Sequence, residues 1–412
     1  MNKRRRFLII SQVFPPDPTA VGQYLDEAAK DIAKSGADVT VLTANRGYDD
    51  PNSRYLSKEN RDGIQIHRLP LSSFGKANLF MRIFAQLSFL IQCIIRGLFS
   101  YKTTDLLIST SPPMAAICAV VIGFFRKKLK VHYWVMDINP DQAVALGAFK
   151  IRHPFVQAMN WLNRRILRRA DSVIALDRFM QNRLEQKLKD PIKELRSTIE
   201  VIPPWPIDEH LEIVPHGANP FRKDQGWQEK FVVMHSGNHS LVHPLDTLLD
   251  AAEELRNDNR FIFAFIGGGK GKGVVDGRIR KLDAQFGKNG HNIISLPYQP
   301  LEKIRYSLSA ADLHIVSLGN NMSGIVHPCK IYGALRLRKP ILAIGPQESY
   351  LSDILIEIDR GWSVAHGDLS GCIHAIHEAY ASSQKENFTP QILKKSFQRE
   401  DLISCFKNAI AH

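Results

Sequence analysis

The chain has 412 residues, of which 44% are hydrophobic, and its formal net charge is +13. This length predicts two or three domains, and the five cysteines form neither a CxxC pair nor a metal-ligand pattern, which predicts free thiols in a reducing compartment. The apolar run Phe7 to Ile10 after the basic start is too short for a signal-peptide core, so we expect no export and a cytoplasmic protein.

The first half alternates short β-rich runs with helical patterns. Strands are predicted at Arg6–Val13, Asp38–Thr43, Gly63–Leu69, Asp105–Thr110, Lys130–Met136, Ser172–Leu176 and Ile199–Ile202. Helices are predicted at Gly22–Lys34, Leu79–Phe99, Met114–Phe125, Pro154–Arg168 and Arg178–Lys187. This alternation predicts parallel βαβ units and a Rossmann-like domain over residues 1–205.

A segment rich in proline and glycine then predicts a linker over residues 206–230, after which the alternation restarts. Strands are predicted at Phe231–Ser236, Phe261–Ile266, Asn292–Leu296, Leu313–Ser317 and Pro340–Ile344, and helices at Pro244–Arg256, Val275–Gly287, Glu302–Ser309, Pro328–Leu337 and Asp368–Ser383. We therefore expect a second Rossmann-like domain over residues 231–388, and a closing helix in residues 389–412 that packs back toward the first domain. The predicted fold class is α/β, with two doubly wound domains facing a ligand-binding cleft.

The positive charge gathers in short runs, Lys3–Arg6, Arg126–Lys130 and Arg164–Arg169. Such runs favour a polyanionic partner, such as nucleic acid, an anionic membrane or a phosphorylated ligand, although each run alone fits a solvated face equally well. No basic run is interleaved with aromatic residues, so we expect no nucleic-acid partner.

The apolar stretch from Leu79 to Tyr101 has the length of a membrane span, about 20 residues. Arg82 and Arg96 interrupt it, and each costs about 2.5–3.5 kcal/mol at a helix centre. We therefore expect a half-buried helix of the domain that also lies in the membrane interface, with the protein peripheral on the inner face of the plasma membrane.

Candidate site residues follow the carboxyl ends of the predicted strands. In the first half, Gly22 is predicted to begin a helix with amides available to an anion, and Asp137 and Asp141 follow the strand that starts at Lys130. In the second half the candidates are Ser236, Gly237, Asn238, His239, Gly268, Lys270, Tyr298 and Gln299. Because carboxyl ends of parallel strands share one edge, we expect these residues to line one rim. The first half lacks GxGxxG, which disfavours an NAD enzyme.

The segment SGIVHPCKIYGALRLRKP, from Ser323 to Pro340, places Lys330 in the first turn of a predicted helix. A cation there opposes the helix dipole unless an anion binds beside it. We expect free amides of Gly324, Ile325 and Val326 to bind a phosphate group together with Lys330, the alternative being a surface lysine.

The order of these motifs resembles the retaining family 4 glycosyltransferases with the GT-B fold, over nearly the whole chain. The resemblance rests on FPPDPTAVGQYL, VTVLT, TSPP and VHYWVMDINPD in the first half, and on the SGN turn, FIGGG, SLSAADLHIVSL and HPCKIYGALRLRKPIL in the second. The sequence is most similar to bacterial exopolysaccharide and lipopolysaccharide enzymes of the colanic-acid type.

This resemblance implies transfer of a sugar from a UDP- or GDP-sugar to a lipid-linked or growing polysaccharide acceptor. Retention at the anomeric carbon, without an obligatory metal or other cofactor, is implied as well. In such a reaction Lys330 would stabilise the leaving diphosphate, and Asp137 would accept a proton from the acceptor hydroxyl or orient it. Asp137 fits a turn or cap aspartate equally well, and a mechanism in which the departing phosphate takes the proton needs no protein base.

The sequence departs from the family pattern at the donor side. Ile325 and Gly333 stand in place of the two glutamates of E-x7-E, and His243-Pro244 replaces the lysine expected after the GN turn. The donor sugar would then be bound by backbone amides or by His239, and no residue is assigned to the ribose. A GT-B protein that binds nucleotide sugars without transfer, and a same-fold epimerase, are therefore the alternatives.

Overall fold

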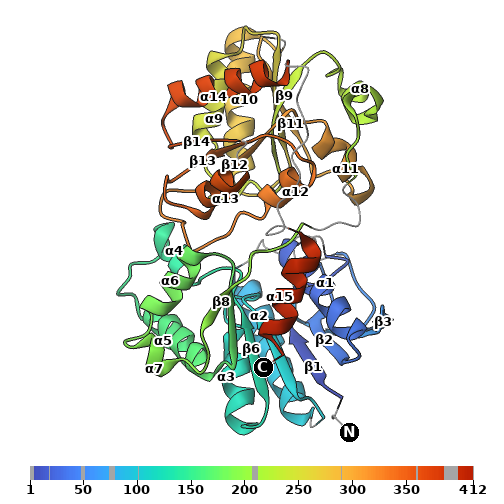
Figure 1. Cartoon of the computed structure of the whole chain (residues 1–412), viewed down its shortest axis with the longest axis vertical. Helices are drawn as coiled ribbons and strands as arrows, with labels where there is room; N and C mark the ends of the chain where they lie inside the picture. The colour runs from blue at the N-terminus through green and yellow to red at the C-terminus, as the bar shows by residue number, and fades with distance from the viewer. Residues whose placement is uncertain are drawn as a thin grey trace. The chain divides into compact units, whose positions relative to one another are not determined.

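The computed structural model describes residues 4–17, 19–47, 52–73, 79–100, 102–206, 212–288, 290–358, 361–384 and 398–411. The chain divides into two compact units, Met1–Pro204 with Glu400–His412, and Trp205–Arg399 (Figure 1). Each unit contains one largely parallel β-sheet flanked by helices. The predicted fold class, two Rossmann-like α/β domains, is confirmed.

The first unit contains an eight-stranded sheet with the order β3-β4-β2-β1-β5-β6-β7-β8. Its strands are β1 (Arg6–Ile10), β2 (Asp38–Ala44), β3 (Lys58–Arg61), β4 (Ile64–Leu69), β5 (Asp105–Ser109), β6 (Lys130–Trp134), β7 (Ser172–Ala175) and β8 (Ile199–Val201). Its helices are α1 (Ala20–Lys34), α2 (Leu79–Phe99), α3 (Ala116–Phe125), α4 (Asp141–Ala145), α5 (Pro154–Arg169), α6 (Arg178–Gln186), α7 (Pro191–Glu194) and α15 (Arg399–Ala409). The sequence missed β3, an antiparallel edge strand, because its residues KENR have no apolar pattern.

The N-terminal basic run is ion-paired within this unit. Arg5 binds the buried carboxylate of Asp105 at the start of β5, and Arg6 and Arg4 pair with Asp38. Burial disfavours the ionised form of Asp105, but hydrogen bonds from His132, Arg5 and Thr104 outweigh it and hold the pKa of Asp105 well below its usual range. These arginines therefore stabilise the sheet, and their charges carry no independent argument for a polyanionic partner.

The predicted C-terminal helix is present as α15 and packs within the first unit. The Phe406 ring lies 4.4 Å from the Trp134 ring, centroid to centroid, and Arg5 donates to the carbonyl of Ile410 at 2.6 Å. The start of the predicted helix, residues 390–397, lies outside the described residues.

The second unit contains a parallel six-stranded sheet with the order β11-β10-β9-β12-β13-β14. Its strands are β9 (Phe231–Ser236), β10 (Phe261–Ile266), β11 (Ile293–Leu296), β12 (Leu313–Ser317), β13 (Ile341–Ile344) and β14 (Gly361–Val364). Its helices are α8 (Pro220–Gln225), α9 (Asp246–Glu254), α10 (Lys272–Phe286), α11 (Leu301–Ser309), α12 (Lys330–Arg336), α13 (Tyr350–Ile358) and α14 (Leu369–Ser383), with a short 3₁₀ turn at His216–Ala218.

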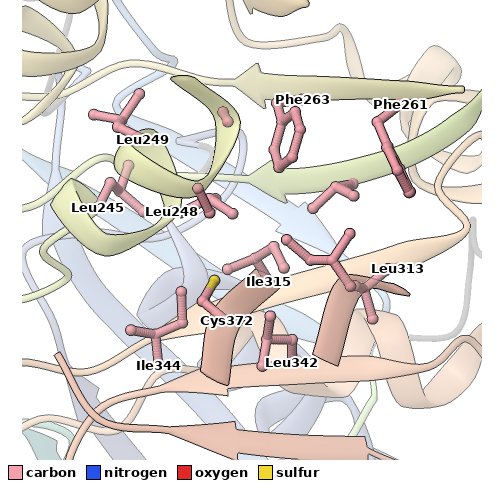
Figure 2. Close-up of a cluster of buried hydrophobic side chains, with 14 of the residues drawn as sticks. Leu245, Leu248, Leu249, Phe261, Phe263, Leu313, Ile315, Leu342, Ile344 and Cys372 are labelled. Carbon is pink, nitrogen blue, oxygen red and sulfur yellow. The ribbon is translucent and has the colours of Figure 1, made fainter. Parts of the chain in front are cut away.

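Aliphatic and aromatic side chains from β10, β12 and β13 pack between the sheet and helices α9 and α14 (Figure 2). Phe263, Ile315, Leu342 and Ile344 come from neighbouring strands and are buried. Cys372 of α14 packs against them as a free thiol. This core fixes the strands whose carboxyl ends form the candidate site.

The linker prediction is wrong for residues 212–230, which pack into the second unit. Asn219 caps α8, and Phe221 and Trp227 are buried in a core cluster. The buried Arg222 guanidinium donates to the carbonyl of Ala310 at 2.7 Å and to Asp312 at 2.9 Å. The proline-rich composition concealed this packing because it comes from isolated aromatic residues without periodicity; residues 207–211 lie outside the described residues.

Candidate functional site

The carboxyl ends of three strands of the second unit lie in register. Ile266, the last residue of β10, pairs with Ser236 at the end of β9 and with Leu296 at the end of β11. The loops that begin at Gly237, Gly267 and Pro297 therefore leave the sheet at one edge. This rim carries the second-half candidates, whose roles as binding residues stay predictions.

Lys330 contacts the loop that follows β9. Its Nζ donates to the carbonyl oxygen of Asn238 at 2.7 Å and lies 3.1 Å from Nε2 of His235. The ring of His235 is buried, and its Nδ1 lies 3.2 Å from the carbonyl of Ile315. Because that carbonyl requires a proton on Nδ1, Nε2 is left as an acceptor for Lys330. Two of the three ammonium protons then have protein acceptors, and the third is available to a ligand.

The charge of Lys330 is not balanced by a carboxylate. Burial by the surrounding groups lowers the pKa of Lys330 from 10.5 to about 7, and the weak opposing effect comes from Cys329. Among the residues that the structure describes, no carboxylate forms an ion pair with its Nζ. By surface area Lys330 is half-buried, and a partly desolvated cation without a counter-ion is unfavourable unless a ligand supplies the charge.

Three histidines surround this cation, and all are neutral at pH 7. Burial lowers the pKa of His235 and His243 well below the usual range, and the charge of Lys330 lowers both further. Burial, followed by the charges of Lys330 and Lys272, lowers the pKa of His239 to about 4. His243 Nδ1 lies 2.7 Å from the carbonyl of Ser317, which fixes that ring.

The imidazole of His239 is buried, and neither ring nitrogen forms a hydrogen bond of good geometry in the described part of the chain, although the backbone of Gly268 and Gly237 lies close enough to oppose the fall of its pKa. Its own backbone amide donates to Gly268 at 2.7 Å, and this bond holds the β9 and β10 loops together. A buried polar group without a hydrogen bond costs about 1–3 kcal/mol, so a bound ligand is expected to form that hydrogen bond. A ligand hydroxyl or phosphate oxygen would satisfy it.

Glycines allow these loops to approach closely. Gly237 has a φ of 122°, and a Cβ on it would lie 2.9 Å from Cε of Lys330. A Cβ on Gly267 would lie 1.9 Å from the carbonyl oxygen of Gly237. A side chain at either position would displace the backbone or Lys330.

The aromatic ring of Tyr298, a residue of the loop after β11, packs against the loop after β10. A Cβ on Gly268 would lie 2.9 Å from the ring of Tyr298, whose hydroxyl donates to the carbonyl of Gly268 at 3.3 Å. Tyr298 remains 54% exposed, so its ring offers a flat surface at the rim. Gln299 beside it donates to the carbonyl of Pro297 at 3.0 Å.

The two lysines of the β10 loop differ. Lys270 is exposed and has no described partner. Lys272 is the first residue of α10, where its ammonium group hydrogen-bonds Ser295 and the carbonyl of Leu296. Lys270 is therefore accessible, and its contact with a ligand stays a prediction, whereas Lys272 ties α10 to β11.

The prediction of free amides is wrong at Ile325, Val326 and Gly22, whereas that of Gly324 stays a prediction. The amides of Ile325 and Val326 both donate to the carbonyl of Met322, at 2.9 and 3.3 Å, because Gly324 (φ 68°) closes a turn there. The amide of Gly22 donates to Oγ1 of Thr19, at 3.3 Å, since Thr19 caps a helix that starts at Ala20 and not at Gly22. The contacts that the structure gives Lys330 are therefore those of its side chain with the β9 loop and with His235.

The sequence missed the residues that position Lys330. The Nε2 of His327 lies 2.8 Å from the hydroxyl of Tyr332, and its ring stacks on Tyr350 with centroids 3.7 Å apart. The Tyr350 hydroxyl donates to the carbonyl of Pro328 at 2.8 Å. Nothing in the sequence places Tyr350 near this turn, whereas His235 was detectable as a polar residue near the end of a buried strand.

Asp137 belongs to the first unit and lies three residues beyond the end of β6, because that strand ends at Trp134 and not at Met136 as predicted. Its amide donates to Oγ1 of Thr110 at 3.1 Å, and burial raises its carboxyl pKa to about 6. No described residue hydrogen-bonds its carboxylate. Asp141, in contrast, opens α4 and pairs with Lys187 at 2.6 Å, which is a structural role.

Gly333, which stands where relatives carry the second glutamate, lies inside α12. A Cβ there would meet Leu308 at 3.7 Å, an ordinary contact, so the backbone does not require glycine at this position. The described residues contain no group of three potential metal ligands.

A surface recess beside Asp258 and Arg260 lies before the start of β10, at the other edge of the sheet from the rim.

Residues 19–205 match the model of the glycosyl transferase 4-like domain. The chain is 26% identical to the probable glycosyltransferase WbjE of Pseudomonas aeruginosa, over 88% of this chain and 86% of the relative. It is 21% identical to the putative colanic acid biosynthesis glycosyl transferase WcaI of Escherichia coli, over 98% and 99%.

Among solved structures, sucrose-phosphate synthase from Thermosynechococcus elongatus superposes with a TM-score of 0.69 at 14% identity, covering 98% of both chains. Anabaena HepE in complex with UDP and glucose superposes with a TM-score of 0.65 at 14% identity, covering 99% of this chain and 96% of HepE. At these identities the superpositions establish the fold.

The class of protein that follows is a glycosyltransferase with the GT-B fold. More narrowly, residues 19–205 match the glycosyl transferase 4-like domain, and WbjE and WcaI are distant homologues over most of the chain, which confirms the resemblance recognised in the sequence.

Proposed function

We propose that this glycosyltransferase takes its sugar from a nucleotide diphosphate sugar, and that Lys330 binds the diphosphate. The charge at the site supports this proposal: an ammonium group with a pKa near 7 is held by two neutral acceptors and has no described counter-ion. A diphosphate would supply that counter-ion and would raise the pKa of Lys330 on binding. As the bond to the sugar breaks, negative charge grows on the phosphate, where the fixed ammonium group stabilises it.

Lys339, a second lysine of the same unit that contacts a histidine, can be compared with Lys330 in its surrounding charge. Lys339 Nζ lies 2.8 Å from Nε2 of His216, the same arrangement that joins Lys330 to His235. Burial lowers the pKa of Lys339 to about 8, but Asp312 lies near it and opposes that effect. Among the described residues, a carboxylate thus lies near one of these two half-buried lysines and none lies near the other.

Other residues of the rim are assigned by their chemistry. His239 hydrogen-bonds a hydroxyl of the donor sugar through its unsatisfied ring, and Lys270 adds a mobile positive charge beside the phosphates. The exposed ring of Tyr298 stacks on the nucleobase. HepE, which shares the fold, is a protein solved with UDP-glucose, and UDP-sugars are therefore the first donors to test, followed by GDP-sugars.

Asp137 is proposed to orient the acceptor hydroxyl or to accept its proton. With a pKa of about 6 it is mostly ionised at pH 7, and it is a stronger base than an ordinary aspartate. The role does not extend to Asp141, because Lys187 occupies its carboxylate.

For the acceptor we propose a lipid-linked or growing cell-surface polysaccharide, and for the location the inner face of the plasma membrane. The names of two relatives support the acceptor class, WcaI with colanic acid and the solved galactosyltransferase WaaB with the lipopolysaccharide outer core. The chain is 12% identical to WaaB, so the linkage and the acceptor sugar do not transfer from it.

A panel of UDP- and GDP-sugars tests the donor proposal, with thermal shift as the binding readout and nucleotide release as the turnover readout. We expect one nucleotide class to stabilise the protein and to release its nucleotide when acceptor is added, with the anomeric configuration retained in the product by NMR. If no nucleotide stabilises the protein, the donor proposal is wrong. Binding without any transfer or hydrolysis would indicate a protein that holds nucleotide sugars without turning them over.

A further inference from the structure

Helix α2 exposes an apolar face along its whole length. The exposed large side chains are Phe80, Met81, Ile83, Phe84, Leu87, Ile91, Ile95 and Phe99, each 40–83% accessible. At 100° per residue they lie on one side of the helix, whereas Ala85, Phe89, Leu90 and Cys93 on the other side are buried. Scattered exposed apolar residues are ordinary on soluble proteins, but a continuous stripe of this length marks an interaction surface.

The stripe continues at the end of the neighbouring helix. Helices α2 and α3 pack against each other, as the guanidinium of Arg126, just after α3, donates to the carbonyl of Gly97 at 2.9 Å. Phe124 and Phe125, the last residues of α3, are 70% and 68% exposed. We call α2 together with this end of α3 the α2–α3 surface.

Positive charge surrounds this aromatic end, and the nearby carboxylate of Asp171 is ion-paired with Arg169 and Arg196. Arg96, Lys102, Lys127 and Lys128 are exposed around Phe99, Phe124 and Phe125. Lys102 is brought there because Arg126 also donates to the carbonyl of Thr103, at 2.7 Å. From residue 63 to residue 136 the sequence has one acidic residue, Asp105, which is buried against Arg5 and His132.

We propose that the α2–α3 surface docks on an anionic lipid bilayer, with α2 lying in the plane of the interface. The apolar stripe enters the region between headgroups and acyl chains, and the lysines and arginines at its end contact anionic headgroups. This combination of an apolar face and a basic rim without an unpaired carboxylate among the described residues fits a bilayer surface better than it fits a protein partner, which would need complementary carboxylates at particular positions.

A spanning orientation is incompatible with the packing of α2. By length and composition Phe80–Phe99 is apolar enough to cross a membrane, and 28% of it is buried. Its inner face, however, holds the domain together: a Cβ on Gly97 would lie 2.3 Å from Ile122, and Gln92 donates to the carbonyl of Pro70 at 2.7 Å. Extracting the helix would break these contacts and expose the buried face of α3.

Vesicle co-sedimentation of the full chain tests the proposal. Vesicles of phosphatidylglycerol and phosphatidylethanolamine are compared with neutral phosphatidylcholine vesicles, and we expect binding to the anionic ones that weakens with salt. Leu87→Ser with Ile91→Ser should lower the partition at least about tenfold, and Lys127→Gln with Lys128→Gln about fivefold per lysine. Ile192→Ser, at a 94% exposed residue of α7, is the matched control and should bind like the wild type.

Each alternative has its own outcome. Failure of the wild type to bind anionic vesicles, or unchanged binding of the Leu87→Ser, Ile91→Ser protein, overturns the proposal. Retention in the membrane after alkaline carbonate extraction indicates spanning and overturns it as well. A dimer that the same double substitution converts to a monomer, without vesicle binding, would assign the face to a second copy. Phe124→Ser with Phe125→Ser provides an independent variant should the Leu87→Ser, Ile91→Ser protein be unstable. Nucleotide binding is measured for every variant, so that a loss of vesicle binding is distinguished from a failure of the donor proposal.

Discussion

Replacing Lys330 with methionine should stabilise the protein in the absence of ligand. Methionine is similar in length and apolar, so the change removes a desolvated cation from the rim. The fall of the Lys330 pKa from 10.5 to about 7 corresponds to about 5 kcal/mol of destabilisation at about 1.4 kcal/mol per pH unit. The substitution leaves His235 and the carbonyl of Asn238 without their donor, which costs about 1–3 kcal/mol. At the upper end of that cost, the net gain is about 2 kcal/mol at pH 6.

The sign of the pH dependence provides a sharper check. A lysine whose folded pKa is depressed destabilises the fold fully below that pKa, and the penalty disappears as the pH rises toward its unfolded value. Between pH 6 and pH 9 the wild type should therefore gain about 3 kcal/mol that Lys330→Met does not gain. The advantage of the variant then vanishes near pH 9.

Thermal unfolding of both proteins at pH 6 and pH 9 measures this difference. A gain of about 2 kcal/mol corresponds to a midpoint about 4–8 °C higher for a domain of this size. Groups common to both proteins cancel in the comparison. A Lys330→Met protein that melts below the wild type at pH 6, or a difference that stays constant with pH, would refute the view that Lys330 is a desolvated and uncompensated cation.

Three further outcomes follow from the same geometry. The affinity for a UDP-sugar should fall about tenfold for each pH unit above 7, because Lys330 loses its proton there and the phosphates of a UDP-sugar do not titrate near neutrality. Calorimetry from pH 7 to 9 measures this affinity, and a constant affinity over that range would contradict the prediction. Gly237→Ala should cost about 1–3 kcal/mol of stability and weaken the UDP-sugar, because its Cβ meets Lys330, whereas Gly273→Ala, with open space around it, should do neither. Asp137→Asn should lower kcat about 10²–10⁴-fold without changing donor affinity; normal turnover by this variant would leave the reaction without a protein base.

The sequence predicted most of the elements built on compact apolar runs, but it missed the apolar helix α13 and the strand β14 as well as polar or short elements. β9, β10 and β12 have the predicted bounds because FVVMHS, FIFAFI and LHIVS are compact, buried runs. β3 is polar and lies at an edge, and α8 is short, so neither has a period to detect. Only the packing of Phe221 and of the nearby Trp227 into the second unit makes α8 part of that unit.

The candidate site divides in the same way. Lys330 and the turn at Gly237 were predictable because polar residues after buried strands meet at one edge. The hydrogen-bonding state of the neighbouring amides was not, since the turn at Met322 and the cap at Thr19 consume donors that the sequence suggested were free. The contacts of Lys330 with His235 and Asn238 join residues more than 90 positions apart, and such contacts depend on the packed fold.

Calorimetric titration of UDP at pH 6.5 tests the central claim, that Lys330 binds the donor diphosphate, most directly. It compares the wild type with Lys330→Met and with Lys339→Met, which removes a buried lysine that also contacts a histidine but lies near Asp312. We expect Lys330→Met to weaken binding about 10–100-fold and Lys339→Met to bind UDP like the wild type. Equal affinity of the wild type and Lys330→Met for UDP would contradict the account.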